Sequence, residues 1–60
     1  MANQDRLEVL LADLGMEVGL AQDLAGHGKL DRVLLAMDRV DDARKAVVTE
    51  VKRLVHRRSS

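Results

Sequence analysis

The apolar residues between positions 30 and 55 recur at a helical spacing, and this pattern constrains the fold more than any other feature. They follow one another at intervals of three, four and seven residues, as on one side of an α-helix. The stripe consists of Leu30, Val33, Leu34, Met37, Val40, Val47, Val48, Val51, Leu54 and Val55. The period-two alternation of a half-buried strand is missing. The pattern therefore predicts one long helix over about residues 29–57.

The preceding segment is also amphipathic and predicts a helix over about residues 4–25. Gly15 and Gly19 lie inside it, and each glycine costs about 1 kcal/mol relative to alanine in a helix interior. Two interpretations remain open. In the first, the helix is continuous, and Ala12, Gly15 and Gly19 form a surface that another helix backbone approaches closely. In the second, the helix breaks near Gly15.

Gly26-His27-Gly28 separates the two segments and predicts a turn over residues 26–28. Glycine often follows the last residue of a helix, and a second glycine can act as the N-cap of the next helix. The predicted fold class is all-α, an antiparallel helical hairpin in a single domain over residues 1–60.

A chain of 60 residues has difficulty burying enough surface to be stable alone. Disulfides, a structural metal or oligomerisation usually support such small domains. The sequence has no cysteine, and it also lacks the aromatic residues that contribute most to burial. Association with another chain is the support that remains.

The apolar residues are assigned to two surfaces. The seam between the helices should contain Leu30, Val33, Met37, Val40, Val47 and Leu54 of the second helix. A partner interface is predicted at Val9, Met16, Leu20, Val51, Leu54 and Val55. The first three form a second apolar stripe on the first helix, which a hairpin leaves exposed. The last three lie in the final turns of the second helix, which are expected to extend beyond the start of the first. A homodimeric four-helix bundle with coiled-coil packing would cover both groups. A helical protein of another kind is the alternative partner.

Asp41 and Arg44 interrupt the apolar stripe halfway along the second helix. They are three residues apart and could pair. They could set the register of a helical interface, or Arg44 could simply extend its charged end into solvent.

Charge is distributed unevenly although the net charge is zero. Residues 1–25 carry five carboxylates and one arginine, a net charge of −4, whereas residues 44–58 carry six basic residues and one glutamate, a net charge of +5. A polyanion such as nucleic acid could contact Lys52, Arg53, Arg57 and Arg58. The absence of aromatic residues that could stack on bases makes this a secondary alternative.

No enzymatic activity, cofactor or metal site is expected. Asp38, Asp41 and Asp42 share one helix face but have basic neighbours, and His27 and His56 lack the spacing of metal ligands. No apolar segment approaches the roughly 18–20 residues of a membrane span. The first residues also lack a signal-peptide layout, so a cytoplasmic location is expected.

In length and layout, two helices joined by a short glycine turn, the chain resembles several small bacterial hairpin proteins. These include dimeric plasmid-copy-number regulators of the Rop type and small helical co-chaperones of type III secretion systems. The resemblance implies a helical interaction protein. No residue motif carries it, so no family is assigned.

Overall fold

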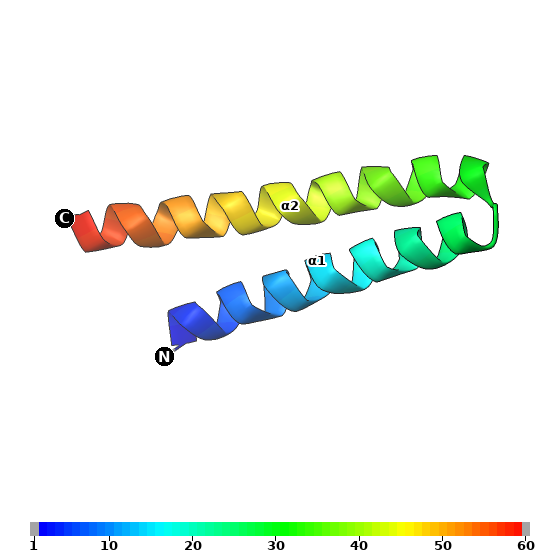
Figure 1. The fold of residues 1–60 in the computed structure, drawn as a ribbon. Coiled ribbons are helices and arrows are strands. Elements are labelled where there is room, and N and C mark those ends of the chain that lie inside the picture. Colours follow the sequence, from blue (N-terminus) through cyan, green and yellow to red (C-terminus); the bar gives the residue numbers. More distant parts are fainter. Residues whose placement is uncertain (1, 60) are drawn as a thin grey trace.

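The computed structural model describes the backbone of residues 2–59 and the side chains of residues 5–58. Two antiparallel helices, α1 (Ala2–Gly26) and α2 (Leu30–Ser59), lie side by side and are joined by a short turn (Figure 1). The backbone of residues 2–59 contains no strand. The predicted all-α helical hairpin is therefore confirmed. Its dimensions are 48 × 17 × 10 Å, those of a thin, elongated slab.

Helix α1 is continuous through both of its internal glycines. A Cβ atom added at Gly15 or Gly19 would meet nothing within 4 Å. The alternative of a break near Gly15 is therefore wrong. Helix α2 also does not approach α1 at these two glycines, so any close helix approach there would have to come from another chain.

Glycine at position 28 ends α1. Gly28 has a φ of 72°, a left-handed conformation that side-chain-bearing residues adopt only at a cost. Its N–H donates to the carbonyl of Ala25 (3.0 Å), and the N–H of Lys29 donates to the carbonyl of Leu24 (3.0 Å). These two bonds form a Schellman motif. The predicted N-cap role of Gly28 is wrong, because the Lys29 carbonyl accepts the first hydrogen bonds of α2.

The seam between the helices follows intervals of three and four residues on both of them. On α1 the half-buried or buried positions of this row are Leu7, Leu10, Leu14, Glu17, Ala21 and Leu24. On α2 they are Val33, Ala36, Val40, Ala43, Val47, Glu50 and Leu54. Such spacing is typical of a two-stranded coiled coil, in which two positions of every seven face the other helix.

The structure corrects two of the six residues predicted for the seam of α2. Val33, Val40, Val47 and Leu54 lie in it, but Leu30 is 68% exposed and Met37 is 48% exposed. Ala36, Ala43 and Glu50 occupy the second row instead. Alanine allows two helix backbones to approach closely, and among residues 5–58 the buried apolar residues are Ala21 and Ala36. Leu30, Leu34, Leu35 and Met37 of α2 are left exposed outside the seam.

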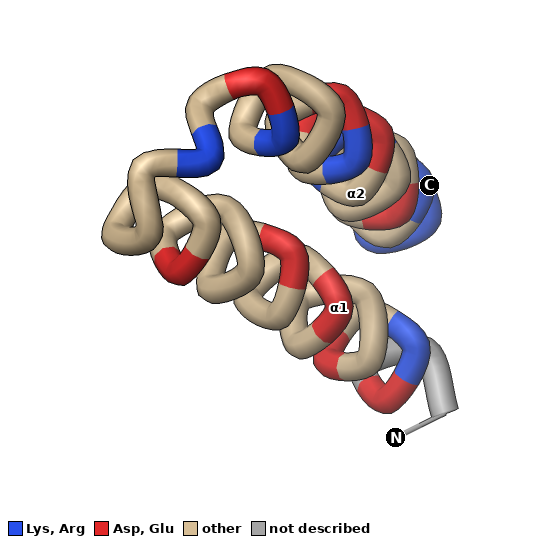
Figure 2. Tube along the Cα trace, turned by 90° about the vertical axis from the view of Figure 1, so that its right-hand side faces the viewer, with Lys and Arg blue, Asp and Glu red and all other residues tan. Residues whose placement is uncertain are grey.

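Basic residues are concentrated on α2, whereas carboxylates occur on both helices. Figure 2 shows Asp and Glu spaced along both helices, while most Lys and Arg lie near the turn and along α2. The hairpin brings the end of α2 to the same end of the molecule as the start of α1 (Figure 1). Opposite charges of the two helices are therefore neighbours at the open end of the hairpin.

Candidate interaction surface

Two long faces of the hairpin flank the seam, and each has a shallow groove. The groove on the first face has a volume of about 250 Å³ and is lined by Val18, Ala21, Gln22 and Ala25 of α1 and by Val33, Met37 and Val40 of α2. The groove on the opposite face has a volume of about 310 Å³ and is lined by Leu20 and Leu24 of α1 and by Arg32, Leu35, Ala36 and Arg39 of α2. The first face is apolar, and the second combines leucines with arginines.

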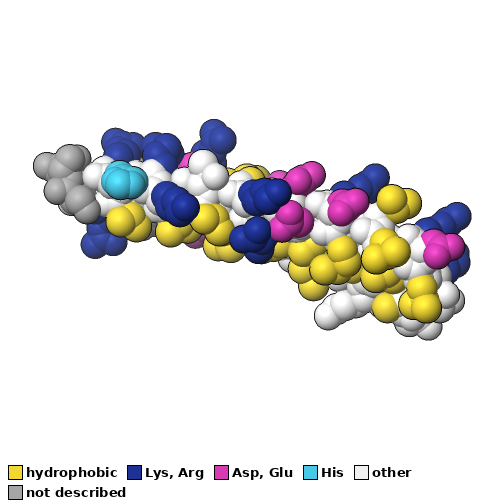
Figure 3. Space-filling view, turned by 90° about the horizontal axis from the view of Figure 1, so that it is seen from above, with side chains coloured by type: hydrophobic (Ala, Val, Ile, Leu, Met, Phe, Trp, Pro, Cys, Tyr) yellow, Lys and Arg dark blue, Asp and Glu magenta, His cyan; other side chains and the backbone are white. Residues whose placement is uncertain are grey.

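The apolar face extends along the whole hairpin. On α1 it continues at seven-residue intervals through Leu11, Val18 and Ala25. On α2 it consists of Leu30, Leu34, Met37, Val48, Val51 and Val55. Each of these six side chains is at least 37% exposed. Figure 3 shows hydrophobic side chains along one long edge of α2, where they widen into a patch toward the turn.

An ion cluster interrupts this face at the middle of α2. Arg44 donates to Asp41 Oδ1 from Nη2 (3.0 Å) and Nε (3.3 Å), and Lys45 Nζ lies 3.1 Å from Asp41 Oδ2. The hydrogen bonds from Lys45 and Arg44 stabilise the carboxylate and lower the pKa of Asp41. The predicted pairing of Asp41 with Arg44 is confirmed. Its role in an interface remains a prediction.

The residues predicted to contact a partner lie on different faces. Val9, Met16 and Leu20 are exposed and share one side of α1, and Leu20 lines the groove that contains the arginines. Val51 and Val55 are exposed on the apolar face of α2. The structure does not bring these two groups together. The sixth residue, Leu54, is half-buried in the seam.

The small residues of α1 form part of its outer surface. Ala12 and Gly15 are exposed, and the space beside Gly15 and Gly19 is open. The close approach predicted for Ala12, Gly15 and Gly19 is not made by α2 and remains a prediction for another chain.

A buried glutamate, which the sequence pattern did not indicate, lies at the open end of the hairpin. Glu50 is only 5% exposed. Arg53 donates to it from Nη2 (2.6 Å) and Nε (3.1 Å), and Arg6 Nε of α1 lies 3.5 Å from its Oε1 atom. The hydrogen bonds from Arg53 lower the pKa of Glu50, and the charge of Arg6 adds to this effect. Glu50 therefore links the two helices electrostatically.

The predicted polyanion-binding residues surround the end of α2. Successive residues of an α-helix are about 100° apart around its axis, so Lys52, Arg53, Arg57 and Arg58 do not share one side. Arg53 is also engaged by Glu50, in a bond that raises the pKa of the Arg53 guanidinium. This arrangement does not form a single basic surface.

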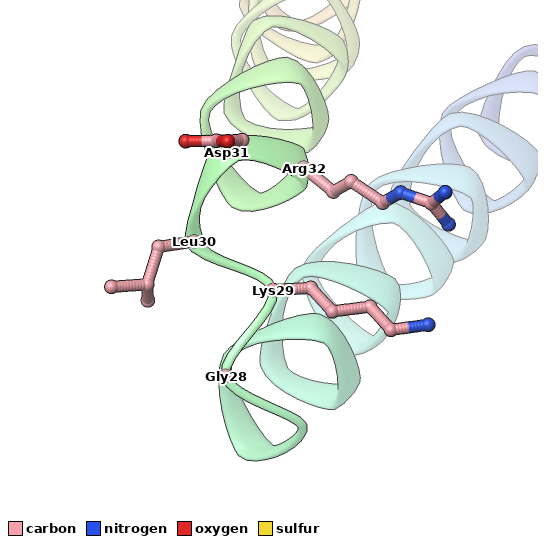
Figure 4. A pocket seen from close by; sticks show the side chains of 5 residues that line it. All are labelled: Gly28, Lys29, Leu30, Asp31 and Arg32. Atoms are coloured by element: carbon pink, nitrogen blue, oxygen red, sulfur yellow. The ribbon is translucent and has the colours of Figure 1, made fainter.

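A depression of about 410 Å³ lies beside the turn and is lined by Gly28, Lys29, Leu30, Asp31 and Arg32. Its side chains do not converge: Leu30 and Asp31 point to one side, and Lys29 and Arg32 point to the other, over the end of α1 (Figure 4). A ligand would find no set of polar groups aimed at one point.

Within the described residues, no group of three or more His, Asp or Glu side chains is placed to hold a metal ion. His27 in the turn donates from Nδ1 to the carbonyl of Asp23 (2.7 Å), which ties its ring to the end of α1. Neither helix, over its described length, combines the length and apolarity that crossing a membrane requires.

No protein-family model, no curated protein and no solved structure matches the chain.

Proposed function

We propose that this chain is a non-enzymatic protein–protein interaction module, a helical hairpin that self-associates, most simply as a homodimeric four-helix bundle. It would act as a scaffold, an adaptor or a small regulator. One observation carries the proposal: twelve Leu, Val and Met side chains of the described residues are at least 37% exposed. No large side chain of the described residues is fully buried. Apolar surface of this extent usually belongs to an interface.

The accessible surface supports the same proposal. The chain exposes 4869 Å², whereas a compact monomer of its mass is expected to expose roughly 3,900 Å². The excess of roughly 1,000 Å² is close to the ~800 Å² that each partner buries in a standard interface. One interface of ordinary size would therefore give the chain the burial of a globular protein.

The elongated shape of the chain also supports the proposal. Its radius of gyration is 14.2 Å, whereas a compact domain of this length has a radius of about 10 Å. A compact domain of twice this length has a radius of about 14 Å. Two slabs stacked face to face would bury one long face of each without lengthening the particle.

A different helical protein is the alternative occupant of the apolar face, as for a co-chaperone. In that case the chain alone should be poorly folded and prone to aggregate. Nucleic acid binding by the basic end of α2 is a third possibility. It would weaken steeply as salt is raised, because bound phosphates release counterions. A cytoplasmic site of action remains a prediction from the sequence.

Sedimentation of the purified chain at micromolar concentration tests the proposal. We expect a folded, helical particle with about twice the mass of the 6.7 kDa chain. A folded monomer at that concentration would contradict self-association. An aggregating chain that becomes soluble only with another protein would support the alternative partner.

A further inference from the structure

The apolar face of α2 has an internal symmetry. Together with the ion cluster it forms one row, which we call the α2 row: Leu30, Leu34, Met37, Asp41, Arg44, Val48, Val51 and Val55. Successive members are four, three, four, three, four, three and four residues apart, so the spacing is the same from either end. Three apolar residues lie on each side of the central charged pair, Asp41 and Arg44. Reversing the direction of the row exchanges these two opposite charges.

A row with this symmetry is suited to antiparallel pairing with itself. Side chains spaced alternately by three and four residues interlock with the same spacing on a second helix. A twofold axis at the centre of an interface pairs residue i of one copy with residue j of the other, and residue j with residue i. Such an axis between Asp41 and Arg44 would pair the two halves of the α2 row.

We infer that the chain forms a twofold-symmetric dimer in which the α2 helices pack antiparallel along this row. The inference rests on the proposed self-association and identifies the occupant of the apolar face as a second copy. Asp41 meets Arg44 of the partner subunit, and Arg44 meets Asp41 of the partner subunit. The apolar pairs are Leu30 with Val55, Leu34 with Val51 and Met37 with Val48, each joining the two copies.

The charged pair selects this arrangement over others. In a parallel dimer in register, each Asp41 would face the other Asp41 and each Arg44 the other Arg44, and like charges at an interface repel. An antiparallel dimer shifted by seven residues would place Asp41 against Met37 or against Val51. That shift would bury the charged cluster against apolar side chains, with no opposite charge on the other copy to face it.

Helix α1 is compatible with the same axis. The contact of Arg6 with Glu50 places the start of α1 level with the later part of α2. The midpoint of the α2 row, at residues 42 and 43, is then level with residues 13 and 14 of α1. This level lies between Leu11 and Val18, both exposed members of the apolar face. The axis would therefore relate these two residues across the dimer as well.

Disulfide trapping tests the geometry, because the chain has no cysteine of its own. We would make Met37→Cys and Val48→Cys separately, confirm their helicity, and oxidise each alone and in an equal mixture. Only the mixture should form a disulfide-linked dimer. In the inferred dimer, two copies of the same variant place their cysteines eleven residues apart along the helix, about 16 Å, whereas a disulfide requires Cα atoms within about 7 Å.

Leu34→Cys with Val51→Cys is a second pair in case one substitution disturbs folding, and it should behave in the same way. If each variant forms a disulfide dimer with itself, the helices pack in parallel and the inferred arrangement is wrong. If sedimentation shows a dimer but neither mixture is trapped, another face mediates self-association. If the unmodified chain is a folded monomer, the inference fails together with the proposed function.

Discussion

Arg6 Nε lies 3.5 Å from Glu50 Oε1, and this ion pair joins the start of α1 to the seam of α2 at the open end of the hairpin. Glu50 is 5% exposed, and Arg53 holds both of its carboxylate oxygens within 3.1 Å. All buried polar side-chain atoms of the described residues have hydrogen-bond partners. The hydrogen bonds from Arg53 favour the ionised form of this enclosed carboxyl group over its protonated form.

Acid should therefore weaken the fold. The pKa of Glu50 is lowered by Arg53 from its ordinary value of 4.5, so its ionised form is stabilised in the folded state. This stabilisation is complete above pH 4.5 and is lost as the pH falls through the lower folded pKa. Urea unfolding followed by circular dichroism should show a loss of stability from about pH 4.5 downward. Glu50→Gln should be less stable at pH 7 and depend less on acid; an unchanged acid response would show that Glu50 is not its source.

Substitution of the turn glycine should destabilise the hairpin. Gly28→Ala forces a side chain into a φ of 72°, which costs about 1–2 kcal/mol. Gly26→Ala is the matched control, because Gly26 lies in α1, its φ is not in the left-handed region, and the space beside it is open. Chemical unfolding of both variants should show a loss for Gly28→Ala and none for Gly26→Ala. Equal stabilities would contradict the observed end of α1.

Substitution of the glycines inside α1 should have the opposite effect. Gly15→Ala and Gly19→Ala should each stabilise the helix by about 0.5–1 kcal/mol, because an added Cβ meets no atom. The same variants should sediment as the unsubstituted chain does if the dimer uses the apolar face. If they dissociate the dimer, another helix packs on this outer surface, as the sequence alone had suggested.

Several features of this fold could be predicted from the sequence because they depend on neighbouring residues. The apolar spacing predicted both helices, and Gly26-His27-Gly28 predicted the turn. The row Val33, Val40, Val47 and Leu54 was also assigned correctly to the seam. These features depend on helix periodicity and on the backbone freedom of glycine, which are local properties.

The remaining features depend on how two distant segments fit. Larger side chains at Leu30 and Met37 were expected in the seam, but Ala36 and Ala43 lie there because small residues permit the close approach of the backbones. The burial of Glu50 depends on Arg6, which is distant in sequence. The residues of the predicted interface lie on two different faces for the same reason. The sequence alone does not show which residues share a face, because the faces depend on which residues form the seam.

Charge exchange within the α2 row should control association. Asp41→Arg places two arginines at the centre of the row, and Arg44→Asp places two carboxylates there. Each variant alone should dimerise at least about tenfold more weakly, since like charges then meet at the axis. An equal mixture should recover association, because each arginine meets a carboxylate of the other chain. Sedimentation equilibrium measures both effects; a mixture no tighter than the separate variants would mean that these residues do not meet across the interface.

The dependence of thermal unfolding on protein concentration tests most directly whether a second copy completes this fold. Melting followed by circular dichroism, over a roughly hundredfold range of concentration, should give a midpoint that rises with concentration, because association stabilises the folded state by mass action. Helicity should decline on dilution at a fixed temperature. A cooperative melt whose midpoint is the same at every concentration would contradict the view that the exposed apolar face needs a partner.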